Sequence, residues 1–214
     1  MKDPLLLFCL LLFVQPLHAQ NTLNDTLIKQ LTIIGVDDQK YRNRMGELRA
    51  KYASDTAELG RQLNAIRTVW RETDSINLVK VTAIIEQYGW LGEDVVGPSG
   101  NQTLFMVIQH ADLATQQKYL PMLRQAVADK KLRASSLALL EDRIAIREGR
   151  KQIYGTQVSM NMKTGKNKLL PLDDPDNVDQ RRTAAGLMPL AQYLKAYFNI
   201  DWDLKKYKKG KLIP

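Results

Sequence analysis

The chain has 214 residues, a formal net charge of +8, one cysteine and two histidines. Its length fits one domain or two small ones, and a content of 44% hydrophobic and 25% charged residues is that of an ordinary globular protein. The single cysteine excludes a disulfide framework and every metal site built from several cysteines.

The first segment resembles a secretory signal peptide. Residues 5–14 form an unbroken apolar run, followed by Pro16 and the small residue Ala19. A helix of this length rises only about 15 Å, about half of the hydrocarbon core of a bilayer. We therefore expect residues 1–19 to be a signal peptide that is cleaved before Gln20. The mature chain would be exported, periplasmic or extracellular, with no transmembrane span, no cysteine and one histidine, His110.

The amino-terminal half of the mature chain has a helical pattern. A short amphipathic segment over 20–36 precedes a charged helical pattern over 37–71, where two glycines leave one long helix or two shorter ones open. Asp74 or Ser75 can cap the next helix. Four glycines and a proline then predict a loop over 89–101.

The second half is predicted to be more varied. Residues 103–110 are apolar on nearly every side, which is typical of a helix in the middle of a core. Near-alternation of polar and apolar residues around Thr164 and Gly165 predicts a β-hairpin. Further helices are expected over 116–128, 134–147, 178–185 and 190–198.

These elements predict an α+β fold, a single mostly α-helical domain over 20–203 with a late antiparallel β-hairpin. A basic tail over 204–214 follows, with five lysines in the last ten residues; without them the charge of the rest is +3. Such tails are mostly solvated. We therefore expect no nucleic acid partner, while a weak contact with an envelope surface through the tail stays open.

The residue inventory excludes several kinds of active site. One histidine and no cysteine in the mature chain exclude cysteine–histidine pairs and zinc sites with several histidines. The chain also lacks the glycine patterns of phosphate-binding and dinucleotide-binding loops and the Gly-x-Ser-x-Gly elbow of many serine hydrolases. We predict no metal site and no cofactor.

His110 is the first candidate for chemistry, because it ends the most apolar predicted helix. A helix C-terminus favours the protonated ring by up to about 2 kcal/mol, and burial opposes protonation. An imidazole under these opposed influences can titrate near neutral pH, as general acid–base catalysis requires. Alternatively, His110 caps the helix end or forms a hydrogen bond with a loop carbonyl.

Asp142 is the second candidate, because apolar residues lie three and four positions away on both sides of it. A carboxylate on such a stripe needs a partner, and His110, Arg143, Arg181 and Arg182 are the candidates. Pairing with His110 would make a base and the group that orients it. Pairing with an arginine would instead hold the carboxy-terminal helices to the core. Both interpretations stay open.

A third group consists of neutral polar residues in the segment before the hairpin: Gln152, Tyr154, Thr156 and Gln157. On a strand the first three share one face and the last points to the other, and such side chains suit a polar ligand. Arg181 and Arg182 can clamp a carboxylate or phosphate, or they neutralise the acidic stretch before them.

Many of these residues belong to a set of short motifs that follow one another in a fixed order along the chain. Its elements are Asp37-Asp38-Gln39 with Arg42, Asp74 with Asn77, Gly89-Trp90, Gly97, Gln109-His110-Ala111-Asp112, Gln116, Leu120-Pro121, Asp142-Arg143, Gln152-x-Tyr154-Gly155-Thr156-Gln157, Asp174-Pro175, Val178-Asp179-x-Arg181-Arg182 and Gly186-Leu187. Their order and spacing resemble a bacterial family catalogued as domain of unknown function 6624. Where many members have Gly-Trp-Pro, this chain has Leu91. The resemblance implies a shared set of polar residues and brings no activity.

The leading hypothesis is a polar pocket for a small or peptide-like ligand, with His110 and Asp142 as the catalytic residues. The ligand-binding candidates are Gln109, Gln152, Tyr154, Gln157, Arg181 and Arg182. Whether the chain is an enzyme stays open; metal-independent hydrolysis or lyase chemistry is the class that this inventory supports. The alternative is a non-catalytic envelope protein whose polar residues form a rigid buried network.

Overall fold

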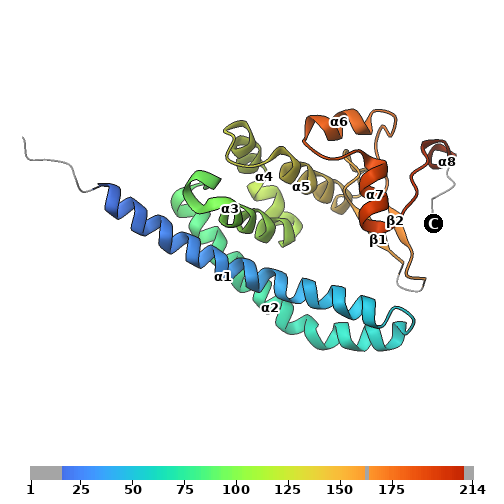
Figure 1. Ribbon diagram of the computed structural model, residues 1–214, viewed down its shortest axis with the longest axis horizontal. Coiled ribbons are helices and arrows are strands. Elements are labelled where there is room, and N and C mark those ends of the chain that lie inside the picture. Colours follow the sequence, from blue (N-terminus) through green and yellow to red (C-terminus); the bar gives the residue numbers. More distant parts are fainter. Residues whose placement is uncertain (1–15, 162–163, 210–214) are drawn as a thin grey trace, which may run out of the picture.

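Two long helices, α1 (Pro16–Lys51) and α2 (Thr56–Tyr88), form an antiparallel hairpin along one side of the computed structural model (Figure 1). The structure describes residues 16–161 and 164–209. The apolar run 5–14 lies outside the described residues, so the signal peptide stays a prediction. In the described residues, no helix is long and apolar enough to cross a membrane.

The boundaries of these two helices differ from the predicted ones. Helix α1 runs through the predicted short segment 20–36, and α2 begins at Thr56, where the Asp55 carboxylate accepts a hydrogen bond from the backbone N–H of Glu58 at 2.9 Å. The glycines at 46 and 60 do not break the helices, because an interior glycine costs only about 1 kcal/mol and packing outweighs it.

Helix α3 (Glu93–His110) crosses the centre of the molecule and packs against α1. It begins inside the predicted loop 89–101, which is therefore wrong over most of its length. Inside α3 the backbone departs from helical geometry at Gly97, which has a φ of 68° and kinks the helix before Pro98. Beyond the kink the predicted core position is confirmed, with Leu104, Phe105 and Ile108 all buried.

Helices α4 (Leu113–Ala128) and α5 (Ala134–Arg147) form an antiparallel pair behind α3, close to the predicted ranges. The main hydrophobic core lies where α1 to α5 meet. It is built from buried side chains such as Leu31, Val81, Leu104, Leu123 and Leu140. This core holds the carboxyl end of α3, and with it His110, against α1 and α5.

The carboxy-terminal part contains strands β1 (Val158–Met160) and β2 (Asn167–Leu169) and helices α6 (Val178–Ala184), α7 (Leu190–Phe198) and α8 (Leu204–Lys208). The strands pair antiparallel with Val158 opposite Leu169, which confirms the predicted hairpin and the mostly helical α+β class. A second, smaller hydrophobic core supports this part; it contains Leu169, Leu172, Val178, Leu190, Leu194 and Ile200.

The predicted basic tail is partly folded. Residues 204–208 form α8, and the backbone N–H of Leu172 donates a hydrogen bond to the Tyr207 hydroxyl at 2.6 Å. Lys208 forms an ion pair with Asp176 at 2.6 Å. A solvated tail is therefore wrong for this part, because an aromatic ring in the middle of the lysines packs against Trp202.

Candidate functional site

His110 lies at the carboxyl end of α3 and faces α1. Its Nδ1 atom is 3.1 Å from each carboxylate oxygen of Asp38. The His110 side chain is 13% exposed and that of Asp38 only 2%. This buried pair joins two helices that are distant in the sequence.

The sequence of α1 explains why Asp38 is buried. Leu27, Leu31, Ile34 and Asp38 follow one another at steps of four, three and four, so they share one helix face, and all four are buried. The Gln39 side chain donates a hydrogen bond to the Asp38 carboxylate at 2.7 Å. The apolar stripe of α1 thus carries a carboxylate into contact with the end of α3.

Arg42 extends this pair to α2. Its guanidinium lies 3.2 Å from the Asp38 carboxylate and forms a two-pronged pair with Asp74, with both hydrogen bonds at 2.9 Å. The guanidinium also lies over the Trp70 ring, 5.4 Å from its centre. We call His110, Asp38, Arg42 and Asp74 the His110 network.

Burial and charge act in opposite directions within this network. Burial raises the pKa of Asp38. The hydrogen bond and charge of His110 and the charge of Arg42 lower it by more than burial raises it, so the pKa of Asp38 lies below its usual value. Burial lowers the pKa of His110, and Asp38 offsets this only in part because Arg42 and Arg143 also lower it. The neutral imidazole is therefore favoured at neutral pH.

A cavity of 340 Å³ opens beside His110, a size suited to a small molecule. It lies between α2 and the end of α3 and is lined by Asp38, Arg71, Asp74, Ser75, Leu78, Val107, His110, Ala111 and Asp112. Across residues 16–161 and 164–209, no group of three histidine, cysteine or acidic side chains is arranged to hold a metal ion.

Asp142 does not pair with His110 or with any of the arginines considered for it. It is fully buried on α5, and its carboxylate accepts four hydrogen bonds from the segment that follows the helix. The donors are the backbone N–H groups of Ile153, Tyr154 and Thr156 and the Thr156 hydroxyl, at 2.6 to 2.9 Å. The partner of this carboxylate is therefore mainly backbone.

The other predicted polar residues gather around the same segment. The Gln152 amide bridges the backbone of Gln157 and Leu170, while the Gln157 side chain donates to the Thr156 hydroxyl at 3.0 Å. Tyr154 contributes its backbone N–H to Asp142. These contacts hold the segment in place, so we call this group the Asp142 network.

Arg181 and Arg182 also belong to the Asp142 network. Arg181 donates to the carbonyls of Ile153, Asp173 and Asp174 and pairs with the Asp174 carboxylate at 3.0 Å. Arg182 is fully buried and donates to the carbonyls of Tyr154 and Met188, each at 2.6 Å. Both guanidinium groups thus bind the protein's own backbone.

Gln109 is buried next to His110 but faces α5. Its side chain donates to the Leu139 carbonyl at 3.4 Å, and its own carbonyl accepts from Gln116 at 2.7 Å. The structure therefore divides the predicted site residues in two. His110 belongs to one network and Asp142, Gln152, Tyr154, Gln157, Arg181 and Arg182 to the other, with Gln109 between α3 and α5.

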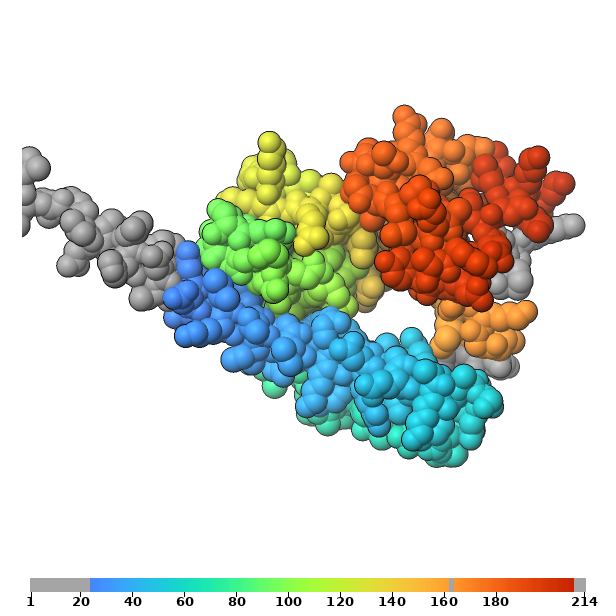
Figure 2. All heavy atoms as spheres, in the orientation of Figure 1, coloured from blue at the N-terminus to red at the C-terminus, as the bar shows by residue number. Residues whose placement is uncertain are grey.

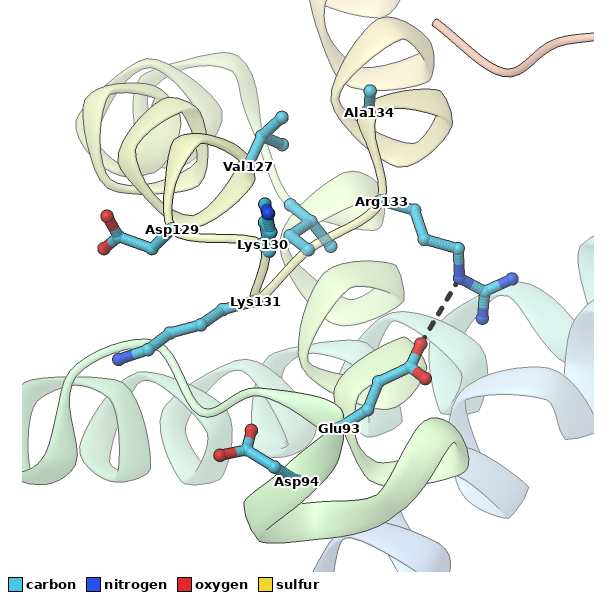
Figure 3. Close-up of a pocket in the computed structure, with 9 residues that line it drawn as sticks. Glu93, Asp94, Val127, Asp129, Lys130, Lys131, Arg133 and Ala134 are labelled. Carbon is cyan, nitrogen blue, oxygen red and sulfur yellow. Dashed lines mark ion pairs between the residues drawn. The ribbon is translucent and has the colours of Figure 1, made fainter.

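Two further hollows are larger than the cavity beside His110, and one of them reaches the His110 network. One, of 880 Å³, lies between the start of α3 and the α4–α5 connection, where Glu93 and Arg133 point toward each other and pair at 3.4 Å (Figure 3). It contains none of the predicted site residues. The other, of 900 Å³, runs between α1 and α3 and reaches Asp38.

Sequence reasoning missed Asp38, Arg42 and Asp74 as site residues, although all three belong to the pattern that resembles the family. One signal could have identified Asp38. It lies on an apolar helical stripe after Leu31 and Ile34, which is the same observation that singled out Asp142.

Comparison with known proteins gives one match. A model of a family of unknown function, DUF6624, matches residues 25–205. No curated protein and no solved structure matches the chain.

Proposed function

We propose that this chain, which belongs to the DUF6624 family of unknown function, binds a small polar or peptide-like ligand beside His110 and uses that histidine as a general base. One observation carries the proposal: the Nδ1 atom of a mostly buried His110 lies 3.1 Å from both oxygens of Asp38, next to a cavity of 340 Å³.

The pairing with Asp38 assigns the two ring nitrogens of His110. A carboxylate accepts a hydrogen bond from Nδ1–H, so the neutral ring keeps its proton on Nδ1 and its lone pair on Nε2. Within the described residues, Nε2 makes no hydrogen bond. Because burial lowers the pKa of His110, the ring is ready to accept a proton at neutral pH.

This arrangement suits metal-independent hydrolysis or a lyase reaction. In hydrolysis, Nε2 takes a proton from water while the water oxygen attacks the carbonyl carbon of an ester or amide. The imidazolium then gives that proton to the leaving alcohol or amine as its bond to the carbon breaks. In a lyase reaction Nε2 takes a proton from carbon, and the electron pair expels a leaving group. In both cases Asp38 stabilises the imidazolium that forms. Arg42 pairs with the same carboxylate at 3.2 Å and helps to hold it in place.

We further propose that the protein acts outside the cytoplasm, because its first residues have the pattern of a signal peptide. A small molecule or peptide is the proposed partner. Nucleic acid is not, since the charge outside the last ten residues is only +3. A weak envelope contact through the lysines of the last ten residues belongs to the same proposal.

A second candidate is a non-catalytic envelope protein whose polar residues stabilise the fold. The observation that favours it is Asp142, whose carboxylate is fully occupied by its own chain. The same reasoning applied to His110 would make the His110 network a rigid connection between α1, α2 and α3.

The variant His110→Gln separates the two candidates, with Lys118→Gln as a control on the exposed surface. Thermal unfolding is followed with and without a panel of esters, amides, hydroxy acids and short peptides, and turnover of each is measured. The proposal expects an unchanged or higher melting temperature and the loss of any ligand effect and turnover. A destabilisation of about 2 to 4 kcal/mol with no compound bound by the unaltered protein would favour the second candidate.

A further inference from the structure

Arg143, on α5, has no counter-ion among the described residues. Its Nε atom is buried and has no hydrogen-bond partner. In the part of the chain that the structure describes, no acidic side chain pairs with its guanidinium. A cation removed from water without a partner is costly, so this side chain is poorly explained by the fold alone.

The contacts of its neighbours on α5 place Arg143 beside His110. Leu139, one turn earlier, accepts a hydrogen bond from the Gln109 side chain at 3.4 Å. Arg147, one turn later, donates to the Ala111 carbonyl at 2.6 Å. Since positions 139, 143 and 147 share one helix face, that face runs along the end of α3 where His110 lies.

The charges around Arg143 are of the same sign. Burial, then the charges of Arg147 and Arg42, lower the pKa of Arg143 to about 10. The charge of Arg143 in turn lowers the pKa of His110. The two carboxylates of the His110 network do not relieve this excess, because both Asp38 and Asp74 are already paired with Arg42.

Two other buried arginines have partners, although the Nη2 atom of Arg182 is also buried without one. Arg182 is more deeply buried than Arg143, yet it donates to two backbone carbonyls and lies over the Tyr193 ring at 4.8 Å. Arg42 has its two carboxylates. Arg143 therefore differs from them in having a free guanidinium close to a reactive histidine.

We propose that Arg143 binds the oxyanion, a carboxylate or a phosphate, of a small molecule that lies beside His110. The planar guanidinium matches both groups with two parallel hydrogen bonds. The space-filling view shows an open gap between the α1–α2 hairpin and the carboxy-terminal part, bordered by α1, the end of α5 and α7 (Figure 2). Arg143 is within electrostatic reach of Arg42 on α1 and Tyr193 on α7, two of these elements.

This inference rests on the proposed role of His110 and names the chemical class of the ligand that meets it. Arg143 is not among the residues that line the 340 Å³ cavity, so the oxyanion would lie on the α5 side of the ring, toward the gap. The test uses the chain from Gln20 onward, with inorganic phosphate and acetate as probes. Binding is measured from the shift of the Arg143 Nε–H signal in NMR spectra and from the melting temperature, each against sodium chloride of equal ionic strength. The variant is Arg143→Met, and Arg124→Met is the control, because Arg124 is exposed and paired with Glu141 on the surface.

We expect at least one of the two anions to raise the melting temperature of the unaltered protein and of Arg124→Met. Arg143→Met should bind it at least about tenfold more weakly. Without anion, Arg143→Met should be as stable as the unaltered protein or more stable, since an unpaired charge is removed. Failure of both anions to bind, or equal binding by Arg143→Met, overturns the inference.

His110→Gln makes the two proposals separable. If it keeps anion binding but the unaltered protein has no turnover, the oxyanion site stands and the general-base proposal fails. If turnover depends on His110 while Arg143→Met leaves binding of both anions unchanged, the general-base proposal stands and the oxyanion inference fails. Probes of phosphate and acetate show which of the two groups the site prefers.

Discussion

His110 and Asp38 are separated by 72 positions in the sequence, and the Nδ1 atom of one lies 3.1 Å from both carboxylate oxygens of the other. The pair forms where the buried face of α1 meets the end of α3. Arg42 then ties the same carboxylate to Asp74 on α2. Three helices therefore determine the position of one imidazole ring, which is the kind of support that a preorganised base needs.

Acidification should destabilise the protein through His110. Burial lowers the pKa of His110 in the folded state below its unfolded value of 6.5, so the unfolded chain binds the proton more tightly. Stability is then fully present above that value and decreases as pH falls through it toward the folded pKa. Urea unfolding between about pH 7 and pH 5 should show this slope, which His110→Gln removes. An identical slope in the variant would contradict the assignment.

The variant Asp38→Asn should lower the pKa of His110 further. The hydrogen bond and the charge of Asp38 raise this pKa against burial, and asparagine has no charge and only one acceptor oxygen in place of two. The ring nitrogen signals in ¹⁵N NMR spectra report both the pKa and the tautomer. Glu86→Gln serves as the control, because Glu86 contacts Lys118 and Tyr119 instead. A pKa that rises in Asp38→Asn would overturn the paired geometry.

Asp142→Asn should lower the free energy of unfolding by about 3 to 5 kcal/mol. The carboxylate accepts two hydrogen bonds on each oxygen, whereas an asparagine amide accepts on one oxygen only. At least one backbone N–H then loses its acceptor in a buried place. Glu141→Gln is the control, since Glu141 pairs with Arg124 at the surface and should cost less than about 1 kcal/mol. Equal losses in urea unfolding would argue against a structural role for Asp142.

The sequence predicts the two networks unequally well. Periodicity in the sequence predicts the hairpin and most helices after residue 112. Their ends can also be predicted, because capping residues and glycines mark them locally. Periodicity also gives His110 and Asp142 as unusual positions. It does not give their partners, since Asp38 lies 72 positions from His110 and the partners of Asp142 are backbone N–H groups, which every residue type except proline has.

The start of α3 shows a second limit of the sequence. Residues 89–101 contain the glycines and proline of a loop, yet most of them are helical. Position 100 requires a glycine for a packing reason, because a Cβ there would lie 2.9 Å from the Val96 side chain. This glycine is therefore needed for close packing and not for a loop conformation, and only the tertiary structure shows the difference.

Gly155→Ala should destabilise the protein more than Gly165→Ala, although both glycines have nearly the same backbone conformation, with φ of 73° and 68°. Alanine in this left-handed region costs about 1 to 2 kcal/mol at either position. At position 155 the new Cβ would also lie 2.8 Å from the Leu190 side chain, whereas at position 165 no atom of the described residues lies within 4 Å. Overpacking adds about 1 to 3 kcal/mol at position 155 only.

Gly155 turns the chain between two backbone N–H donors of Asp142, so Gly155→Ala should also expose their amide protons to faster hydrogen exchange. Equal unfolding free energies for the two variants would mean that α7 does not pack on this segment.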